Sequence, residues 1–410
     1  MMKMKVLHIV GGSIKNGAFK GAAILHKGLL KENIDSKILN DSNLKIQNIQ
    51  LEQDKKIVSI KERLLLNILN KIYVTIEKIL KFIFLHSPRE TFSISILGFD
   101  ITKFKEYQEA DIIHIHWLGQ GFINLNSLSK IDKPVVWTMR DMWPFSGGPH
   151  YTMDFEKYEK SRISQLIKNY KKKNYKKNFI FVAVSKWLKK EAERSSVLKN
   201  YNIIQIDNNI DTSNFEELDK ETARSILNIN TKKKVILYGA QNPQSKRKGW
   251  NIFTDTLKKI DKSKYFLLIF GNFWSNKLLQ DIGIEYKSLG YINDNKILNA
   301  VYNSSDFFIA SSIQDAWPKI FAEAMYCKVP VICFKNTSVS EIVEHKTNGF
   351  IIDEYNTDLF KEAIDWISTQ LDKNNNLGEN AKEKVKRYDS EIIASKYFEL
   401  YKKIYKTNTS

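Results

Sequence analysis

Residues 306–325, DFFIASSIQDAWPKIFAEAM, hold the pattern on which the fold prediction depends. The apolar run at 306–310 predicts a buried strand, and residues 322–325 predict the start of a helix. A strand end, a polar loop and a helix start form the usual ligand-binding place in an open α/β sheet. Asp315 and Glu323 bracket this loop, with seven residues between them. They could bind a ligand, or Asp315 could cap a turn and Glu323 could be an ordinary first-turn helix acid.

Similar apolar runs, separated by helical stretches, occur along the rest of the chain. They lie at 6–10, 36–39, 112–116, 134–138, 180–184 and 203–206, and then at 234–239, 265–271, 307–310, 329–334 and 349–352. Near-continuous apolar strands that alternate with helices are typical of parallel sheets covered on both faces. We therefore predict an α/β protein with two facing Rossmann-like domains, residues 1–211 and 212–387, and a cleft between them. A C-terminal helix at 388–410 is expected to pack back toward the first domain.

Composition limits the class of protein. The chain has 410 residues, 43% of them apolar, and a net charge of +18. No uncharged apolar window is long enough to span a membrane, and the N-terminus lacks a secretory signal, so we expect a cytoplasmic protein, soluble or peripheral. Cys327 and Cys333 have no zinc or disulfide spacing and are expected to be buried thiols. The charge fits nucleic acid, an anionic membrane or phosphorylated substrates, but it could also reflect a compositional bias toward lysine.

Two basic segments leave alternatives open. Residues 61–86 predict a basic amphipathic helix or helix pair. It could face the core and expose a solvated basic side, or it could lie at a membrane interface. Residues 168–177 are strongly basic with interleaved tyrosines, which indicates a solvated helix face or contact with lipid phosphates. We predict peripheral contact with an anionic membrane through both segments.

Glycine-rich and basic loops follow other predicted strands. Gly12 lies in a glycine-rich first turn without a GxGxxG pattern, so phosphate binding there has weak support. Gly239 ends a strand, and the sequence KRKG follows at 246–249. Three cations and a glycine at a helix start could hold a diphosphate, or they could form a solvated basic turn. The chain has no Asp-x-Asp and no evident His/Asp cluster, so we predict a mechanism that needs no metal.

Several motifs, in this order, resemble those of family 4 retaining glycosyltransferases with the GT-B fold, in a subgroup that assembles bacterial surface polysaccharides. The motifs are Gly11-Gly12 with Gly21-Ala22-Ala23, DIIHIHW at 111–117, WTMRDMWPFSGGPHY at 137–151, VSKWL at 184–188, Arg247-Lys248-Gly249, and the Asp315 to Glu323 pair, which resembles a Glu-x7-Glu signature. The resemblance covers nearly the whole chain. Its specificity rests on the combination and order of the motifs.

The resemblance implies transfer of a hexose from a nucleotide-sugar to a hydroxyl of a lipid-linked or polysaccharide acceptor, with retained configuration. Arg247 and Lys248 would stabilise the diphosphate, Glu323 would hold the ribose and Asp315 the donor sugar. Other donor-binding positions would be Gly12, Gly239, Tyr291, Ile292, Lys319 and Ile320. His116, Arg140 and His150 would lie on the acceptor side. No cofactor, metal or nucleic acid is implied.

The chain departs from the family pattern at three positions. Asp315 replaces the usual Glu and is one methylene shorter. Arg140 replaces a His and cannot act as a general base near neutral pH. Pro149 replaces a Cys, which makes a metal knuckle unlikely to form there. His150 could stabilise a turn or contact the acceptor.

Two other classes of protein compete with the transferase. A nucleotide-sugar epimerase or a phosphorylase could use the same fold. A non-enzymatic basic protein that binds RNA or membrane would fit the charge, although the sequence has no nucleic-acid motif.

Overall fold

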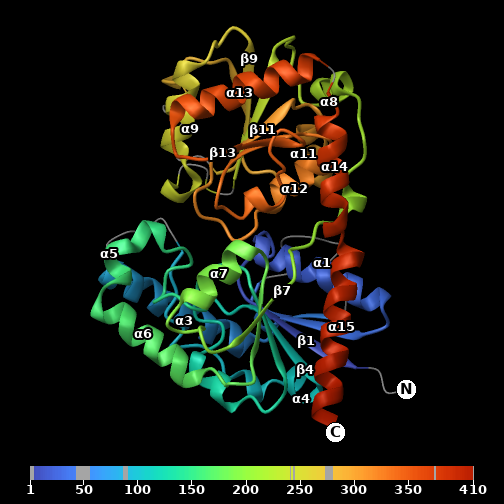
Figure 1. The fold of residues 1–410 in the computed structure, drawn as a ribbon. Coiled ribbons are helices and arrows are strands. Elements are labelled where there is room, and N and C mark those ends of the chain that lie inside the picture. The colour runs from blue at the N-terminus through green and yellow to red at the C-terminus, as the bar shows by residue number, and fades with distance from the viewer. Residues whose placement is uncertain are drawn as a thin grey trace. The chain divides into compact units, whose positions relative to one another are not determined.

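The chain forms two compact units. The computed structural model describes residues 4–42, 56–85, 91–240, 242, 245–272, 280–373 and 375–409. The first unit consists of Met1–Asn209 together with Ser390–Ser410, and the second unit is Ile210–Asp389. In each unit helices flank a twisted sheet (Figure 1).

The first unit contains a seven-stranded sheet in the order β3-β2-β1-β4-β5-β6-β7, and all neighbouring strands are parallel. The strands are β1 (Lys5–Val10), β2 (Asp35–Asn40), β3 (Ile57–Ser59), β4 (Ile112–Trp117), β5 (Val135–Met139), β6 (Ile180–Ala183) and β7 (Asn202–Gln205). Strands β4 and β5 are almost entirely buried, as expected for a parallel sheet with both faces covered.

The α-helices of the first unit include one from the end of the chain. They are α1 (Gly17–Lys31), α3 (Leu64–Leu85), α4 (Lys105–Glu109), α5 (Glu156–Glu159), α6 (Arg162–Asn174), α7 (Lys186–Arg194) and α15 (Ser390–Thr409). Leu25 and Leu29 of α1 share a buried cluster with Tyr397 and Tyr401 of α15. Helix α15 therefore completes the core of the first unit.

The second unit contains a six-stranded parallel sheet in the order β10-β9-β8-β11-β12-β13. The strands are β8 (Lys234–Gly239), β9 (Tyr265–Phe270), β10 (Tyr286–Ser288), β11 (Phe307–Ala310), β12 (Val331–Phe334) and β13 (Gly349–Ile352). The α-helices are α8 (Lys220–Ile226), α9 (Trp250–Lys259), α11 (Asn295–Asn303), α12 (Lys319–Tyr326), α13 (Thr357–Asp372) and α14 (Leu377–Val385). Helices α9 and α13 pack on the sheet through one apolar cluster. The prediction of two Rossmann-like α/β domains is confirmed.

Helix α12 begins earlier than the sequence pattern indicates. It starts at Lys319, directly after Pro318, whereas we expected its start at Ala322. Proline is compatible with a helix start because the first N–H groups of a helix have no intrahelical acceptor. The polar loop after β11 is therefore shorter than expected and ends at Pro318.

The segments that enter and leave the second unit lie side by side. Ile210 forms an isolated parallel bridge with Asp389, and the Ile210 N–H donates to the Tyr388 carbonyl at 2.9 Å. The Thr212 hydroxyl donates to the Asp389 carboxylate. The first and last residues of the second unit are thus hydrogen-bonded to each other.

The structure shows how the two basic segments fold. Residues 64–85 form the single helix α3, in which seven large apolar side chains are exposed while Leu80 packs on a buried cluster, so only part of its apolar surface faces the protein. Lys171 and Tyr175 are buried, so residues 168–177 are not simply a solvated face. The Lys171 ammonium donates to the carbonyls of Trp143 and Ser146 and lies 3.9 Å from the centre of the Trp143 ring. Lys171 thus supports the aromatic loop that follows β5.

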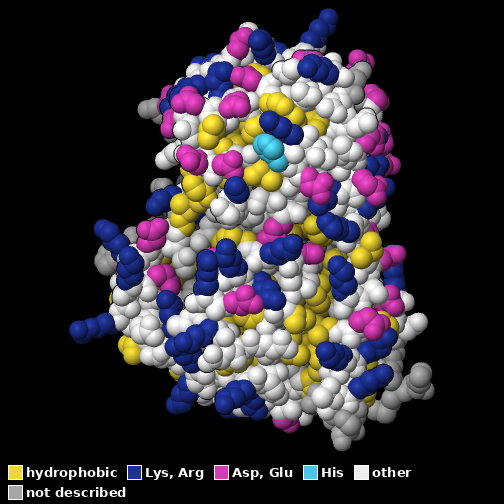
Figure 2. All heavy atoms as spheres, viewed as in Figure 1, with side chains coloured by type: hydrophobic (Ala, Val, Ile, Leu, Met, Phe, Trp, Pro, Cys, Tyr) yellow, Lys and Arg dark blue, Asp and Glu magenta, His cyan; other side chains and the backbone are white. Residues whose placement is uncertain are grey.

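The charge is spread over the surface. Figure 2 shows Lys and Arg side chains on the visible face of both units, with Asp and Glu among them and no continuous basic stripe. Among the helices within the described ranges, none combines the length and apolarity that crossing a membrane requires.

Candidate functional site

Two loops of the second unit are joined at the carboxyl ends of neighbouring strands. One loop follows β8 and the other follows β11, and these strands pair in the sheet. The Ile313 N–H donates to the Arg247 carbonyl at 2.8 Å, and the Ser311 hydroxyl donates to the Lys248 carbonyl at 2.7 Å. The Arg247 guanidinium donates back to the Gln314 carbonyl at 3.4 Å. These bonds hold the loop after β8, which contains Arg247 and Lys248, against the loop after β11, which contains Asp315.

Three of the four residues predicted to be catalytic meet there. The Lys248 ammonium donates to the Asp315 carboxylate, and an Arg247 guanidinium nitrogen lies 3.6 Å from the same oxygen. Both side chains of the Lys248–Asp315 pair are only 9% exposed. An anionic ligand that reached the two cations would compete with Asp315 for them.

Gly249 makes the close approach of the loops possible. Its φ of +67° lies in the left-handed region, which side chains disfavour. A Cβ atom at this position would also lie 2.0 Å from the Ser311 carbonyl oxygen. Gly239, at the end of β8, is equally confined, because a Cβ there would lie 2.2 Å from the Phe270 ring.

Glu323 lies on α12, where a tyrosine orients its carboxylate. The Tyr302 hydroxyl, from α11, donates to the Glu323 carboxylate at 2.9 Å. Burial, and next the charge of Glu323, raise the pKa of Tyr302 well above its ordinary value, so the phenol stays protonated and remains a donor. Lys319 and Ile320 are the first two residues of the same helix.

The residues predicted to lie beside the nucleotide base follow β10. Tyr291 and Ile292 are half-buried in the loop after Gly290. Burial raises the pKa of Tyr291, so its ring carries no charge near neutral pH. These residues belong to the same unit as Glu323 and Lys248.

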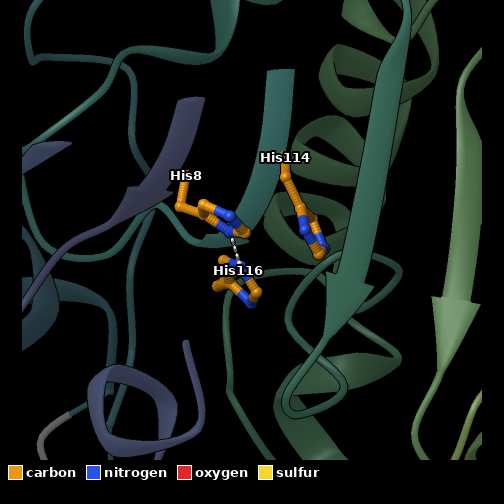
Figure 3. Close-up of side chains that lie close together, drawn as sticks. All are labelled: His8, His114 and His116. Atoms are coloured by element: carbon orange, nitrogen blue, oxygen red, sulfur yellow. Dashed lines mark hydrogen bonds between the residues drawn. The ribbon is translucent and has the colours of Figure 1, made fainter. Parts of the chain in front are cut away.

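In the first unit, the predicted acceptor-side residue His116 belongs to a buried cluster of three histidines (Figure 3). His8 of β1 pairs in register with His114 of β4, and His116 follows two residues later on the same side of the strand. The possible ligand nitrogens of the three lie within 4.8 Å of one another. Our expectation that the chain holds no histidine cluster is therefore wrong, because the cluster joins strands that are far apart in sequence.

Burial lowers the pKa of all three histidines well below the ordinary value, and neighbouring histidines lower it further. The rings are therefore neutral. The Arg140 guanidinium donates to His116 Nδ1 at 3.2 Å, which places the His116 proton on Nε2. That nitrogen then donates to His8 Nδ1 at 2.9 Å, so the second nitrogen of His8 carries a proton. His8 Nε2 is buried and has no partner among the residues that the structure describes.

The hydrogen bonds leave the cluster with little capacity for a cation. His114 uses both ring nitrogens, one with the Thr138 hydroxyl at 2.7 Å and one with the Tyr401 hydroxyl at 2.5 Å. Neutral imidazoles are good metal ligands, but here two of the three would have to give up hydrogen bonds beside the guanidinium of Arg140. The arrangement fits a hydrogen-bonded network that holds Arg140 better than it fits a metal centre.

Arg140 is held from several elements. Its guanidinium donates to the Asn208 side chain, and a Cβ added to Gly21 of α1 would lie 2.6 Å from one of its nitrogens. Gly21 thus allows the guanidinium to lie against α1. Burial lowers the pKa of Arg140, but an arginine remains cationic near neutral pH.

His150 and Gly12 are already engaged within the protein. His150 Nδ1 lies 2.7 Å from an Asp141 carboxylate oxygen, and Nε2 lies 3.0 Å from the Ser93 hydroxyl. These contacts favour the turn-stabilising role of His150. The Gly12 N–H donates to the Asp41 carboxylate at 2.6 Å, and Gly12 belongs to the first unit, apart in sequence from the other predicted donor residues.

A known family matches the part of the chain that carries the joined loops. Residues 219–384 match the model of the family described as Glycosyl transferases group 1, and this range includes Arg247, Lys248, Asp315 and Glu323. The chain is a glycosyltransferase. The prediction of this enzyme class is confirmed.

Three similar proteins extend the comparison. A 41.2 kDa protein from the cps region of Klebsiella pneumoniae is 24% identical over 344 residues, which cover 78% of this glycosyltransferase and 87% of the relative. The structure of HepE from Anabaena with UDP and glucose has a TM-score of 0.68 and 15% identity, and covers 98% of this chain and 100% of HepE. WaaG, a glycosyltransferase involved in lipopolysaccharide biosynthesis, has a TM-score of 0.64 and 12% identity, and covers 96% of this chain and 98% of WaaG. The two structures share the GT-B fold with this glycosyltransferase.

The structure adds several residues that the sequence reasoning missed. His8, His114, Asp41 and Tyr302 each hold a predicted site residue through a hydrogen bond or a ring contact. The His-x-His spacing at 114 and 116, inside a predicted strand, was a usable signal because both side chains must lie on one face. Tyr302 gave no such signal, since its role depends on how α11 packs beside α12.

Proposed function

We propose that this glycosyltransferase moves a sugar from a nucleotide-sugar to a hydroxyl of a lipid-linked or polysaccharide acceptor in the assembly of a bacterial surface polysaccharide. The observation that carries the proposal is the pair of joined loops, which hold Arg247, Lys248 and Asp315 in one buried place. Ligands of open α/β sheets bind at such strand ends. The cps-region relative and WaaG support the surface-polysaccharide context, and HepE supports a nucleotide-sugar donor.

In the proposed reaction, Lys248 and Arg247 receive the diphosphate of the donor. The bond between the anomeric carbon and the diphosphate oxygen breaks, and that oxygen keeps the electron pair. The oxygen of the acceptor hydroxyl forms the new bond to the anomeric carbon, and its proton passes to the departing diphosphate oxygen. Two fixed cations stabilise this developing charge without a metal ion. Asp315, released from Lys248 by the diphosphate, accepts hydrogen bonds from hydroxyls of the donor sugar.

Glu323 would position the donor. The Tyr302 hydroxyl holds the Glu323 carboxylate by a hydrogen bond, and in the proposed complex this carboxylate would accept hydrogen bonds from the ribose hydroxyls. In the first unit, Arg140 would donate a hydrogen bond to the acceptor. Its guanidinium stays protonated near neutral pH, so it cannot take up the proton of the acceptor hydroxyl. Transfer would then occur with retained configuration, as in family 4, on a chain that is cytoplasmic or peripheral at the inner face of the cytoplasmic membrane.

A thermal-shift screen over nucleotide-sugars, beginning with UDP-sugars, tests the proposal. A donor present at a hundred times its Kd stabilises the folded protein by about 2.7 kcal/mol, which raises the Tm by roughly 5–10 °C. We expect this rise in the wild-type protein and its loss in Lys248→Met, whereas the exposed Lys258→Met keeps it. Full transfer activity in both Glu323→Ala and Lys248→Ala would contradict the proposal, as would product formation without any acceptor.

A further inference from the structure

Helix α3 turns its apolar side to solvent. Seven large apolar side chains along it are exposed, from 48% for Ile68 and Ile72 to 77% for Leu64. The full set, which we call the α3 outer face, is Leu64, Leu65, Ile68, Ile72, Ile79, Phe82 and Ile83. These residues recur at helical spacing, so they form one stripe on a helix of 22 residues, about 33 Å long.

The opposite side of α3 is fixed to the protein through apolar and polar residues: Leu80 packs on a buried cluster, and the Tyr73 ring contacts Phe99. Asn70 and Glu77 are almost fully buried. The two Glu77 carboxylate oxygens accept from the N–H groups of Ile94 and Ser95, at 2.9 and 2.7 Å. Rotation of the helix to bury its apolar stripe would break these bonds and leave two N–H groups without an acceptor. The orientation of α3 is therefore set by the fold, and it leaves the stripe of large apolar side chains exposed to solvent.

The charges along α3 indicate what covers this stripe. Residues 64–85 contain one acid, Glu77, and it is the buried one. Lys71 and Lys78 are exposed between the apolar residues of the stripe. Protein interfaces are depleted in lysine, and a second copy of this face would place lysines opposite lysines. An apolar stripe with cations and no exposed acid is typical of a helix that lies in an anionic membrane interface.

Helix α6 also exposes apolar and cationic side chains. Leu80 of α3 and Ile167 of α6 pack on one small buried cluster, so the two helices are neighbours. Helix α6 exposes Ile163 and Leu166, together with Arg162 and Lys172. Helix α6 therefore adds exposed apolar and cationic side chains in the neighbourhood of α3.

We propose that the α3 outer face inserts into the surface of a bilayer that contains anionic phospholipids. The helix would lie in the plane of the membrane, with its apolar side chains among the acyl chains and Lys71 and Lys78 at the headgroups. This gives the membrane contact a defined surface, and it differs from our prediction of the basic run at 168–177, in which Lys171 is buried. The inference does not depend on sugar transfer, because binding to lipid needs no donor.

Vesicle flotation of the full chain tests the surface. The probes are vesicles of phosphatidylcholine alone and vesicles that also contain phosphatidylglycerol, at low and high salt. We expect the wild-type protein to float with the anionic vesicles at low salt. The double variant Lys71→Gln with Lys78→Gln should bind about 30-fold more weakly, from about 1 kcal/mol per lysine near the surface. The double variant Ile72→Ser with Ile79→Ser should bind the anionic vesicles roughly tenfold more weakly or worse, because two apolar side chains are no longer buried in the membrane.

Matched variants separate this surface from general effects. Ile226, on α8, is exposed to a similar degree as Ile72, so Ile226→Ser should leave flotation unchanged. Lys403→Gln, on the exposed side of α15, is the control for charge. All variants should keep the wild-type Tm and the donor-induced thermal shift. Loss of flotation is then distinguishable from misfolding and from a failure of the proposed function.

A second measurement places a probe in the stripe. Thr75 is exposed within the α3 stripe, and Thr75→Cys can carry an environment-sensitive fluorophore in a Cys327→Ser background, since Cys333 is buried. We expect a blue shift with anionic vesicles, and none from a label at Lys403→Cys. Wild-type protein that stays at the bottom of the gradient at low salt would overturn the proposal. So would equal flotation of the α3 variants, or a dimer that these variants convert to a monomer without any lipid binding.

Discussion

The buried pair between Lys248 and Asp315 allows a prediction with a magnitude. Asp315→Asn keeps the shape of the side chain but removes its charge, which leaves the ammonium of Lys248 buried beside the guanidinium of Arg247. Breaking a buried ion pair costs about 3–5 kcal/mol. The amide oxygen of Asn still accepts one hydrogen bond, so we expect the lower value, about 3 kcal/mol. For a unit of this size, that lowers the Tm by roughly 6–12 °C.

Scanning calorimetry without ligand gives the test. The control is Asp353→Asn, which removes the partner of Lys335 from a pair that is exposed on both sides, 58% and 70%. Exposed pairs contribute little, so this variant should melt almost like the wild-type protein. The double variant Lys248→Met with Asp315→Leu should regain part of the stability, because it removes both charges of the closest pair and leaves only the more distant Arg247 without the carboxylate. If Asp315→Asn melts like the Asp353→Asn control, the pair is not the buried contact that we describe.

The same substitution separates stability from binding. Asp315→Asn removes the group that competes with a diphosphate for Lys248 and Arg247, so the affinity for free UDP should rise roughly tenfold. The affinity for the UDP-sugar that the wild-type protein accepts should not rise in parallel, because the contact with the sugar is weakened. Isothermal titration measures both ligands. A fall in UDP affinity in this variant would refute the competition.

Three further predictions concern single positions. Burial lowers the pKa of Lys171 to about 7, so between pH 7 and 10 the unfolded chain binds more protons than the folded chain, and stability rises with pH. Urea unfolding should show that the unfolding free energy of Lys172→Met rises by about 2 kcal/mol from pH 7.5 to 9, whereas that of Lys171→Met does not. If the unfolding free energies of the two variants depend on pH to the same extent, the prediction is wrong. Gly249→Ala introduces strain at positive φ and a clash with a carbonyl, so it should cost roughly 2–4 kcal/mol in unfolding free energy, and an unchanged Tm would speak against that. Glu323→Gln keeps an acceptor for Tyr302, so its Tm should stay close to wild type while transfer falls about 100-fold, and a fully active variant would remove Glu323 from the site.

The sequence predicted the elements that depend on local pattern. Buried strands of a parallel sheet are short apolar runs, and the loops after β8 and β11 could be recognised as ligand positions because each follows such a run. That Lys248 pairs with Asp315 could not be predicted with the same ease. It requires β8 to lie beside β11, and the order of strands is a property of the whole sheet.

The periodicity of α3 shows why orientation escaped prediction. A 3.6-residue repeat establishes that a helix has an apolar and a polar side, but it does not say which side meets the protein. That choice is made by Glu77, whose partners Ile94 and Ser95 belong to a distant segment. Lys171 is a similar case, since a lysine in a basic run is expected in solvent and here satisfies carbonyl groups of the loop after β5.

Helix α15 has a consequence for how the enzyme is made. Tyr401 hydrogen-bonds to His114 and Tyr397 to Thr138, inside a core that also holds Val6 of β1. On the ribosome, these tyrosines emerge only after the whole second unit has been synthesised. Until then, buried polar groups of the first sheet lack partners, at about 1–3 kcal/mol each. The sheet that carries Arg140 can therefore mature only on chains that have been translated through to their last helix, and chains that stop within the second unit should leave it incomplete and open to proteolysis.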